Sequence, residues 1–163
     1  MGRFKYEPSL GSAQYRRTLY TFWRRSIAPT FLFDTAQRRV CEVRSNRTNT
    51  PLQALTLLND ETSREASRVL GVRAVMAGAD ADLRLNWLSE AILGRPLKSD
   101  ETPLLQRSLK SALAHYKDHP ADALKVLQAG QSVLPNAPQQ PEVAAYALVA
   151  SLLFNLDEAM THE

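Results

Sequence analysis

Residues 47–60 have the sequence RTNTPLQALTLLND, and this stretch decides where the helical part of the chain begins. Thr50 precedes Pro51, and Gln53 follows three residues after Thr50, which predicts a capping box with proline at the first helical position. After Pro51, side chains that suit the inner face of a helix recur at helical spacing: Leu52, Leu55 and either Thr56 or Leu58. Asp60 then offers a second N-cap. The pattern therefore predicts two consecutive helices, one from Pro51 and one from Asp60.

The 163-residue chain is long enough for one hydrophobic core, or for two small helical subdomains that share one. Its 44% hydrophobic and 23% charged residues are ordinary for a globular protein. A single cysteine, Cys41, excludes an internal disulfide bond. Residues 1–10 lack an apolar core, so we expect no signal peptide there. Residues 144–156, the longest apolar run, are too few to span a bilayer.

The net charge of +3 conceals two halves of opposite sign. Residues 1–73 contain 13 Lys and Arg against 6 Asp and Glu, a net of +7, whereas residues 74–163 contain 7 against 11, a net of −4. No basic-aromatic motif accompanies the arginines, which argues against a nucleic-acid partner. We expect the basic half to contact the acidic half, another part of a larger protein, or a protein partner.

Hydrophobic periodicity predicts an all-α fold of about six helices packed round an apolar C-terminal helix, preceded by an irregular basic segment. An apolar stripe predicts one helix at about residues 13–25. The other predicted helices cover residues 51–58, 60–77, 80 or 82–93, 99–116, 120–130 and 142–154. We expect Ser99 to cap the fourth of these, and the last to be the most buried because it is apolar nearly all round.

The segment before Pro51 breaks the helical period. Pro29 ends the first predicted helix, and residues 39–44 (RVCEVR) alternate in a way that allows one short strand at most. We divide the chain into an irregular basic segment at residues 1–49 and a helical domain at residues 50–163, best treated together as one domain. Irregular segments on a rigid scaffold often carry function.

One polar group of residues surrounds the start of the helical part. Its members are the candidate site: Asp34, Arg44, Arg47, Thr48, Asn49, Gln53, Asn59 and Asp60. The arginines could clamp a carboxylate of the protein or of a ligand, and the amides could lock the loop by bonding its backbone. We favour structural bracing over a reactive site, because polar groups near a core need hydrogen-bond partners.

No strong catalytic or metal-binding motif is present. His115 and His119 are four residues apart, which places two imidazoles on one helix face, but histidines in a last helical turn also stabilise the helix dipole. We expect no metal site and no cofactor in this chain. Cys41 fits a small buried side chain better than a nucleophile. Glycine-rich phosphate loops, G-x-S-x-G elbows and C-x-x-C-H haem motifs are all missing.

Five segments in order resemble a planctomycete-type family catalogued as domain of unknown function 1553: YRRTLYTFWRRSIAP, FD, VCEVRSNRTNTPLQALTLLND, AILGRPLKSDE and VASLLFNLDEAMTHE. The likeness covers about residues 15–163. The chain departs from the family pattern at Arg44-Ser45, where a doubled arginine is usual. It also departs at Tyr146, often a tryptophan, and at Ala159-Met160, where a bulky aromatic is favoured.

The resemblance implies the C-terminal part of a large exported protein with a cytochrome-c-like domain upstream. It therefore implies an extracytoplasmic location and a chain that is a terminal fragment or short relative. No catalytic residue is established for the family, so none is carried over. We expect a non-catalytic helical interaction or scaffolding module that packs on upstream domains. The alternative is part of an enzyme, for polysaccharide breakdown or cytochrome-linked redox work, in which the polar loop lines a shared cleft.

Overall fold

The computed structural model of the chain describes residues 11, 15, 50–133 and 140–160. The chain divides into two compact units, Met1–Thr48 and Asn49–Glu163, and every described helix belongs to the second unit. The predicted strand at residues 39–44 lies outside the described residues, as does nearly all of the predicted helix at 13–25. No described helix has the length and hydrophobicity that a bilayer span requires.

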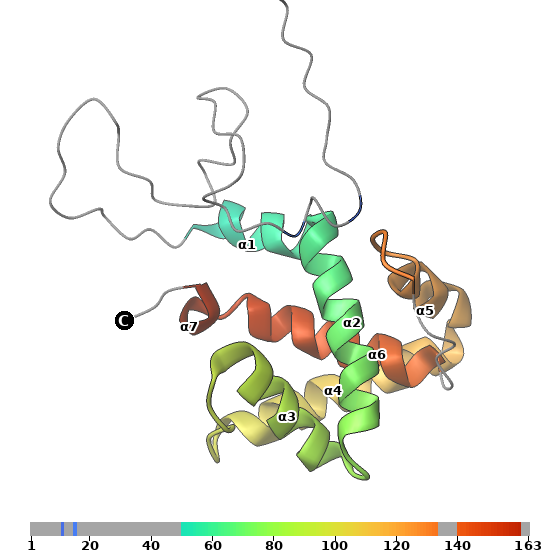
Figure 1. Cartoon of the computed structure of the whole chain (residues 1–163). Coiled ribbons are helices and arrows are strands. Elements are labelled where there is room, and N and C mark those ends of the chain that lie inside the picture. The colour runs from blue at the N-terminus through green and yellow to red at the C-terminus, as the bar shows by residue number, and fades with distance from the viewer. Residues whose placement is uncertain (1–10, 12–14, 16–49, 134–139, 161–163) are drawn as a thin grey trace, which may run out of the picture. The chain divides into compact units, whose positions relative to one another are not determined.

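The second unit is all-α, as predicted (Figure 1). In its described part the helices are α1 (Pro51–Asn59), α2 (Glu61–Ala77), α3 (Ala81–Leu93), α4 (Glu101–Asp118), α5 (Pro120–Leu127), α6 (Gln140–Phe154) and α7 (Asp157–Met160). The predicted limits agree with these within a few residues.

Local capping sets most of these helix limits. Thr50 and Gln53 form the predicted capping box at the start of α1, in which the Thr50 backbone N–H donates to Gln53 Oε1 at 2.6 Å. Asp60 caps α2 by accepting from the Ser63 backbone N–H at 2.9 Å. Gly94 ends α3 in the left-handed conformation, at φ 70°. The predicted caps at Thr50 and Asp60 are confirmed.

The predicted cap of α4 is wrong. The helix begins at Glu101, and Ser99 is not its cap. The Lys98 carbonyl accepts from the Glu101 and Thr102 N–H groups, while the Glu101 carboxylate accepts from the Lys98 N–H at 2.9 Å. Glu101 thus closes the turn from its own side chain, so a serine cap is not needed.

Helix α6 is the centre of the fold, as predicted. All six other described helices contact it, and eight of its fifteen residues are buried. Tyr146 is only 2% exposed, and the Arg84 guanidinium lies 5.6 Å above its ring while donating to Glu142 at 2.6 Å. Burial is the main cause that raises the pKa of Tyr146. Because the apolar α6 lies at the centre, the surrounding helices pack their apolar faces against it and expose their polar faces to solvent.

Helices α2 and α6 cross at unusually close range because small side chains meet there. A Cβ atom added to Gly71 would lie 2.7 Å from the Val143 carbonyl oxygen and 2.8 Å from the Ala147 backbone nitrogen. Ala74, one turn further along α2, is fully buried. Glycine is therefore required at position 71 by space and not by backbone conformation.

Candidate functional site

Five leucines of α1 and α6 are exposed, and we call them the leucine face: Leu52, Leu55, Leu58, Leu148 and Leu152. Their exposed fractions lie between 39% and 57%. Helix α1 has no charged residue, and its one buried side chain is Gln53. Because α1 contacts α6 and Leu58 and Leu148 line the same hollow, the exposed sides of the two helices adjoin. Apolar patches shared by neighbouring elements often mark interaction sites.

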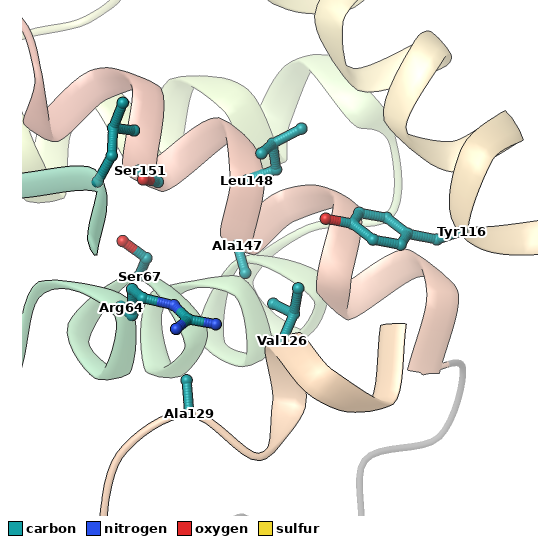
Figure 2. Close-up of a pocket in the computed structure, with 9 residues that line it drawn as sticks. Arg64, Ser67, Tyr116, Val126, Ala129, Ala147, Leu148 and Ser151 are labelled. Carbon is teal, nitrogen blue, oxygen red and sulfur yellow. The ribbon is translucent and has the colours of Figure 1, made fainter. Parts of the chain in front are cut away.

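A half-enclosed hollow of about 140 Å³ opens beside this face (Figure 2). It is surrounded by α1, α2, α4, α5 and α6. Its lining residues are Leu58, Arg64, Ser67, Tyr116, Val126, Ala129, Ala147, Leu148 and Ser151. Most of these side chains are apolar, so the hollow suits an apolar group, and its few polar atoms would decide how that group is oriented.

Three polar groups are available at the hollow. Figure 2 shows the Arg64 guanidinium and the Tyr116 hydroxyl directed into the space between α2, α5 and α6. Burial, with a smaller contribution from the Asp122 carboxylate, raises the pKa of Tyr116, so its phenol stays protonated and can donate. Ser151 adds a hydroxyl from α6, whereas the Ser67 hydroxyl already donates to the Ser63 carbonyl at 2.8 Å. The set can bind an anion or a hydrogen-bond acceptor.

Two buried charged residues of α2 fix the loop that forms one wall of the hollow. Glu65, 4% exposed, accepts from the backbone N–H groups of Gln131 at 3.0 Å and Ser132 at 2.9 Å. Arg68, 3% exposed, donates to the carbonyls of Leu127 at 3.0 Å and Ser132 at 2.8 Å. The two side chains are 3.9 Å apart. This pair, the Glu65–Arg68 clamp, satisfies backbone groups that the loop cannot satisfy itself.

The clamp also explains the glycine within that loop. Gly130 has φ +82°, a left-handed conformation that favours glycine, and a Cβ atom there would overlap the Glu65 side chain. The loop therefore takes a conformation that only glycine allows, and Ala129 is held at the edge of the hollow.

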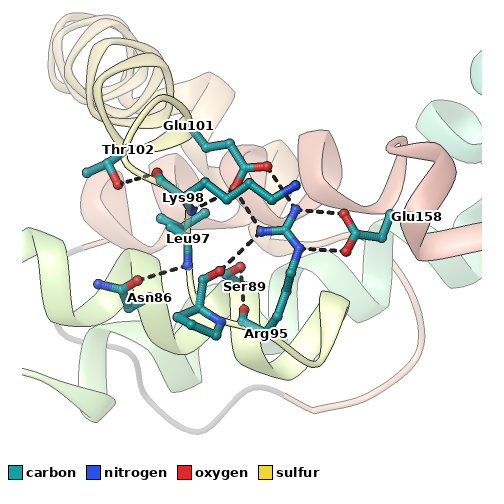
Figure 3. Close-up of polar contacts among 9 residues, drawn as sticks. Asn86, Ser89, Arg95, Leu97, Lys98, Glu101, Thr102 and Glu158 are labelled. Atoms are coloured by element: carbon teal, nitrogen blue, oxygen red, sulfur yellow. Dashed lines mark hydrogen bonds and ion pairs between the residues drawn. The ribbon is translucent and has the colours of Figure 1, made fainter.

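A second polar cluster joins the α3–α4 connection to α7 (Figure 3). Arg95 donates to both carboxylate oxygens of Glu101, each at 2.8 Å, and to both of Glu158, at 2.5 and 2.6 Å. The Arg95 bonds lower the pKa of Glu101 to about 2 and also lower that of Glu158. Ser89 supports the arrangement by donating to the Arg95 carbonyl at 2.8 Å. The cluster anchors α7 by engaging the Arg95 guanidinium with the carboxylates of Glu101 and Glu158.

The histidine pair is occupied by local contacts. The rings of His115 and His119 stack with centroids 4.7 Å apart, and His115 Nε2 lies 3.6 Å from the Asp122 carboxylate. Lys125 donates to the same carboxylate at 2.8 Å and is the main cause that lowers the pKa of Asp122. Within the described residues, no cluster of three or more His, Cys, Asp or Glu residues could hold a metal ion.

The predicted site residues fall into two groups. Asp34, Arg44, Arg47, Thr48 and Asn49 lie outside the described residues. Gln53 and Asp60 are capping residues, and Asn59 is exposed with its amide donating to the Leu55 carbonyl at 2.7 Å. The three described residues thus bond to nearby backbone or capping groups, and none of them lines the hollow. For the complete polar loop, structural bracing remains our prediction.

Sequence reasoning missed the hollow and the clamp. Neither Tyr116 nor Arg64 carried a signal of a site in the sequence. Glu65 and Arg68 did offer one, because they lie six and three residues before Gly71, on the face of α2 that packs inward. Charged residues on a buried face require partners, which points to a clamp.

Comparison with known protein families identifies the family of this chain. The profile of the family PSD1, protein of unknown function (DUF1553), matches residues 3–109, which are 107 of the 163 residues. No curated protein and no solved structure matches the chain. The matched part includes α1 to α3 and the first half of α4. Since the match covers more than half of the chain and agrees with the resemblance of its motifs, the chain belongs to the DUF1553 family.

Proposed function

We propose that the helical unit is a non-catalytic protein-interaction module that binds its partner through the leucine face. The five exposed leucines carry this proposal. Leaving such side chains in water forgoes about 25 cal/mol for each Å² of apolar surface that packing would bury. A partner that covers both helices would recover that free energy. The proposed role needs no cofactor in this chain.

The partner we propose is the polypeptide that precedes this domain in longer, exported members of the family. The resemblance of the motifs suggests this partner, and the net charge of +7 on residues 1–73 suggests that the partner carries acidic residues.

A binding titration tests the proposal. The full chain is mixed with the separately expressed upstream polypeptide of a longer family member, and the dissociation constant is measured by calorimetry. We expect Leu55→Asp to weaken binding at least tenfold, because it places a charge at the centre of an apolar contact. Leu152→Asp should have a similar effect from the α6 side.

Leu104→Asp is the matched control. Leu104 is 60% exposed and Leu55 57%, but Leu104 lies on α4, outside the leucine face. We expect it to leave binding unchanged. Failure of the wild-type chain to bind, or equal effects of the two substitutions, would refute the proposal. So would sedimentation showing that the leucine face instead pairs two copies of this chain.

A further inference from the structure

We propose that the hollow beside the leucine face receives one apolar side chain of the bound partner, and that Arg64 pairs with a carboxylate next to that side chain. This inference rests on the proposed interaction function and names the chemistry that the partner must present. The ligand class is an apolar group of about the size of a phenyl ring or a leucine side chain, with a carboxylate a few bonds away.

The size of the hollow determines which apolar group the partner must present. Its volume of about 140 Å³ is close to that of an apolar cavity of about 150 Å³ that is known to accept benzene. Apolar side chains from three helices and a loop form its walls, among them Val126, Ala129, Ala147 and Leu148. One ring or branched aliphatic group fits this half-enclosed space, whose apolar walls offer a long polar chain few hydrogen-bond partners.

The position of the hollow connects it with the leucine face. Leu58 and Leu148 belong to the face and also line the hollow. A partner lying across the face therefore has the hollow within reach of a single side chain. Interfaces commonly concentrate their binding free energy on such an anchor, seated in a pocket near the middle of the contact.

The positive charge of Arg64 at the hollow is the reason to expect a carboxylate on the partner. Arg64 is exposed and has no ion pair among the described residues, although Glu61 lies one turn away on α2. The carboxylate of Glu65, the next residue along α2, is buried and engaged with loop N–H groups. A planar guanidinium matches a carboxylate through two parallel hydrogen bonds. The Tyr116 hydroxyl supplies a further donor from the opposite side (Figure 2).

Two small probes separate the apolar contribution from the charge. 3-Phenylpropionate has a ring and a carboxylate, and 3-phenylpropanol is its neutral counterpart. Binding of each to the purified full chain is measured by saturation-transfer NMR. We expect the carboxylate to bind with a dissociation constant on the order of 1–10 mM, as suits so small a ligand. The alcohol should bind about five- to tenfold more weakly.

Variants assign the binding to this hollow. Arg64→Gln should abolish the preference for the carboxylate over the alcohol. Arg73→Gln, an exposed arginine two and a half turns along the same helix, is the control and should change nothing. Ala129→Leu places three more carbons in the hollow and should weaken both probes at least fivefold. Ser151→Leu fills it from α6 and serves if the first filling variant unfolds.

The outcomes distinguish this inference from the proposed function. Equal binding of the two probes, no binding, or equal effects of the two arginine variants would overturn the assignment of the hollow even if Leu55→Asp weakens partner binding. If the probes behave as expected but Leu55→Asp leaves partner binding unchanged, the hollow stands as an anionic ligand site and the proposed function fails.

Discussion

Replacing Glu65 by glutamine tests whether the Glu65–Arg68 clamp holds the loop after α5. The carboxylate accepts two backbone N–H bonds, from Gln131 and Ser132, and lies 3.9 Å from the Arg68 guanidinium. Glutamine has nearly the same shape, but one of its terminal atoms is a donor. One loop N–H would therefore face another N–H group, and the negative charge beside Arg68 would be lost.

The geometry gives the size of the effect. A hydrogen bond to a charged group contributes about 1.5–3 kcal/mol, and the substitution removes one and weakens the other. Arg68 would keep its backbone carbonyl partners but lose its nearby counter-charge in a buried position. We expect the free energy of unfolding to fall by about 2–4 kcal/mol. For a unit of about 110 residues this lowers the melting temperature by roughly 9–17 °C.

Urea and thermal unfolding, followed by circular dichroism at 222 nm, measure the loss. Glu61→Gln is the matched control, because Glu61 lies one turn earlier on the same helix but is exposed. Its change should not exceed about 1 kcal/mol, the value of a charge in a first helical turn. If Glu65→Gln costs less than about 0.5 kcal/mol, or no more than Glu61→Gln, the clamp does not hold the loop and the reasoning is wrong.

Two further predictions concern packing and acid stability. Gly71→Ala should lower the free energy of unfolding by up to about 2 kcal/mol, since overpacking against the Ala147 backbone costs about 1–3 kcal/mol and the helix propensity of alanine returns about 1 kcal/mol. Glu101 has its pKa lowered from 4.5 to about 2 by Arg95, so its stabilising effect is full above about pH 4.5 and is lost as the pH falls toward 2. The melting temperature should therefore drop between pH 5 and pH 2.5.

Each of these has an outcome that contradicts it. A chemical denaturation midpoint that rises in the Gly71→Ala variant would mean that the two helices separate without cost. For the acid prediction, Glu101→Gln should already be less stable at pH 7 and should lose less on acidification. A variant whose melting temperature falls with pH as steeply as that of the wild type would show that other carboxylates cause the loss.

Much of the helical framework follows from local sequence. Thr50, Pro51 and Gln53 start α1, and Asp60 starts α2, because capping bonds join groups only three residues apart. The cap of α4 shows where this reasoning stops. Ser99 is a good capping residue by type, but Glu101 closes the turn instead while its carboxylate is also engaged by Arg95. Two local caps were possible, one by Ser99 and one by Glu101. The bonds from Arg95, in the connection between α3 and α4, favour the Glu101 arrangement.

The candidate site depended on contacts that no local pattern contains. Glu65 meets Gln131 and Ser132 across 66 and 67 residues, and Arg95 meets Glu158 across 63. The leucines of α1 are spaced for a helix, yet their spacing does not say whether they face the core or solvent. That depends on where α6 lies, and only the packing of α6 at the centre leaves them exposed.

The sequence by itself determined that the chain from Pro51 onward is helical, where most of its helices begin and end, and to which family it belongs. The helix limits depend on side chains within one or two helical turns of each other, and the family assignment depends on motifs spread along residues 3–109. The tertiary structure alone decided that α2 and α6 cross at Gly71, that a buried ion pair clamps a distant loop, and that an arginine faces an apolar hollow. These depend on which remote surfaces meet, and the free energy of burying the apolar side chains of α6 selects that arrangement.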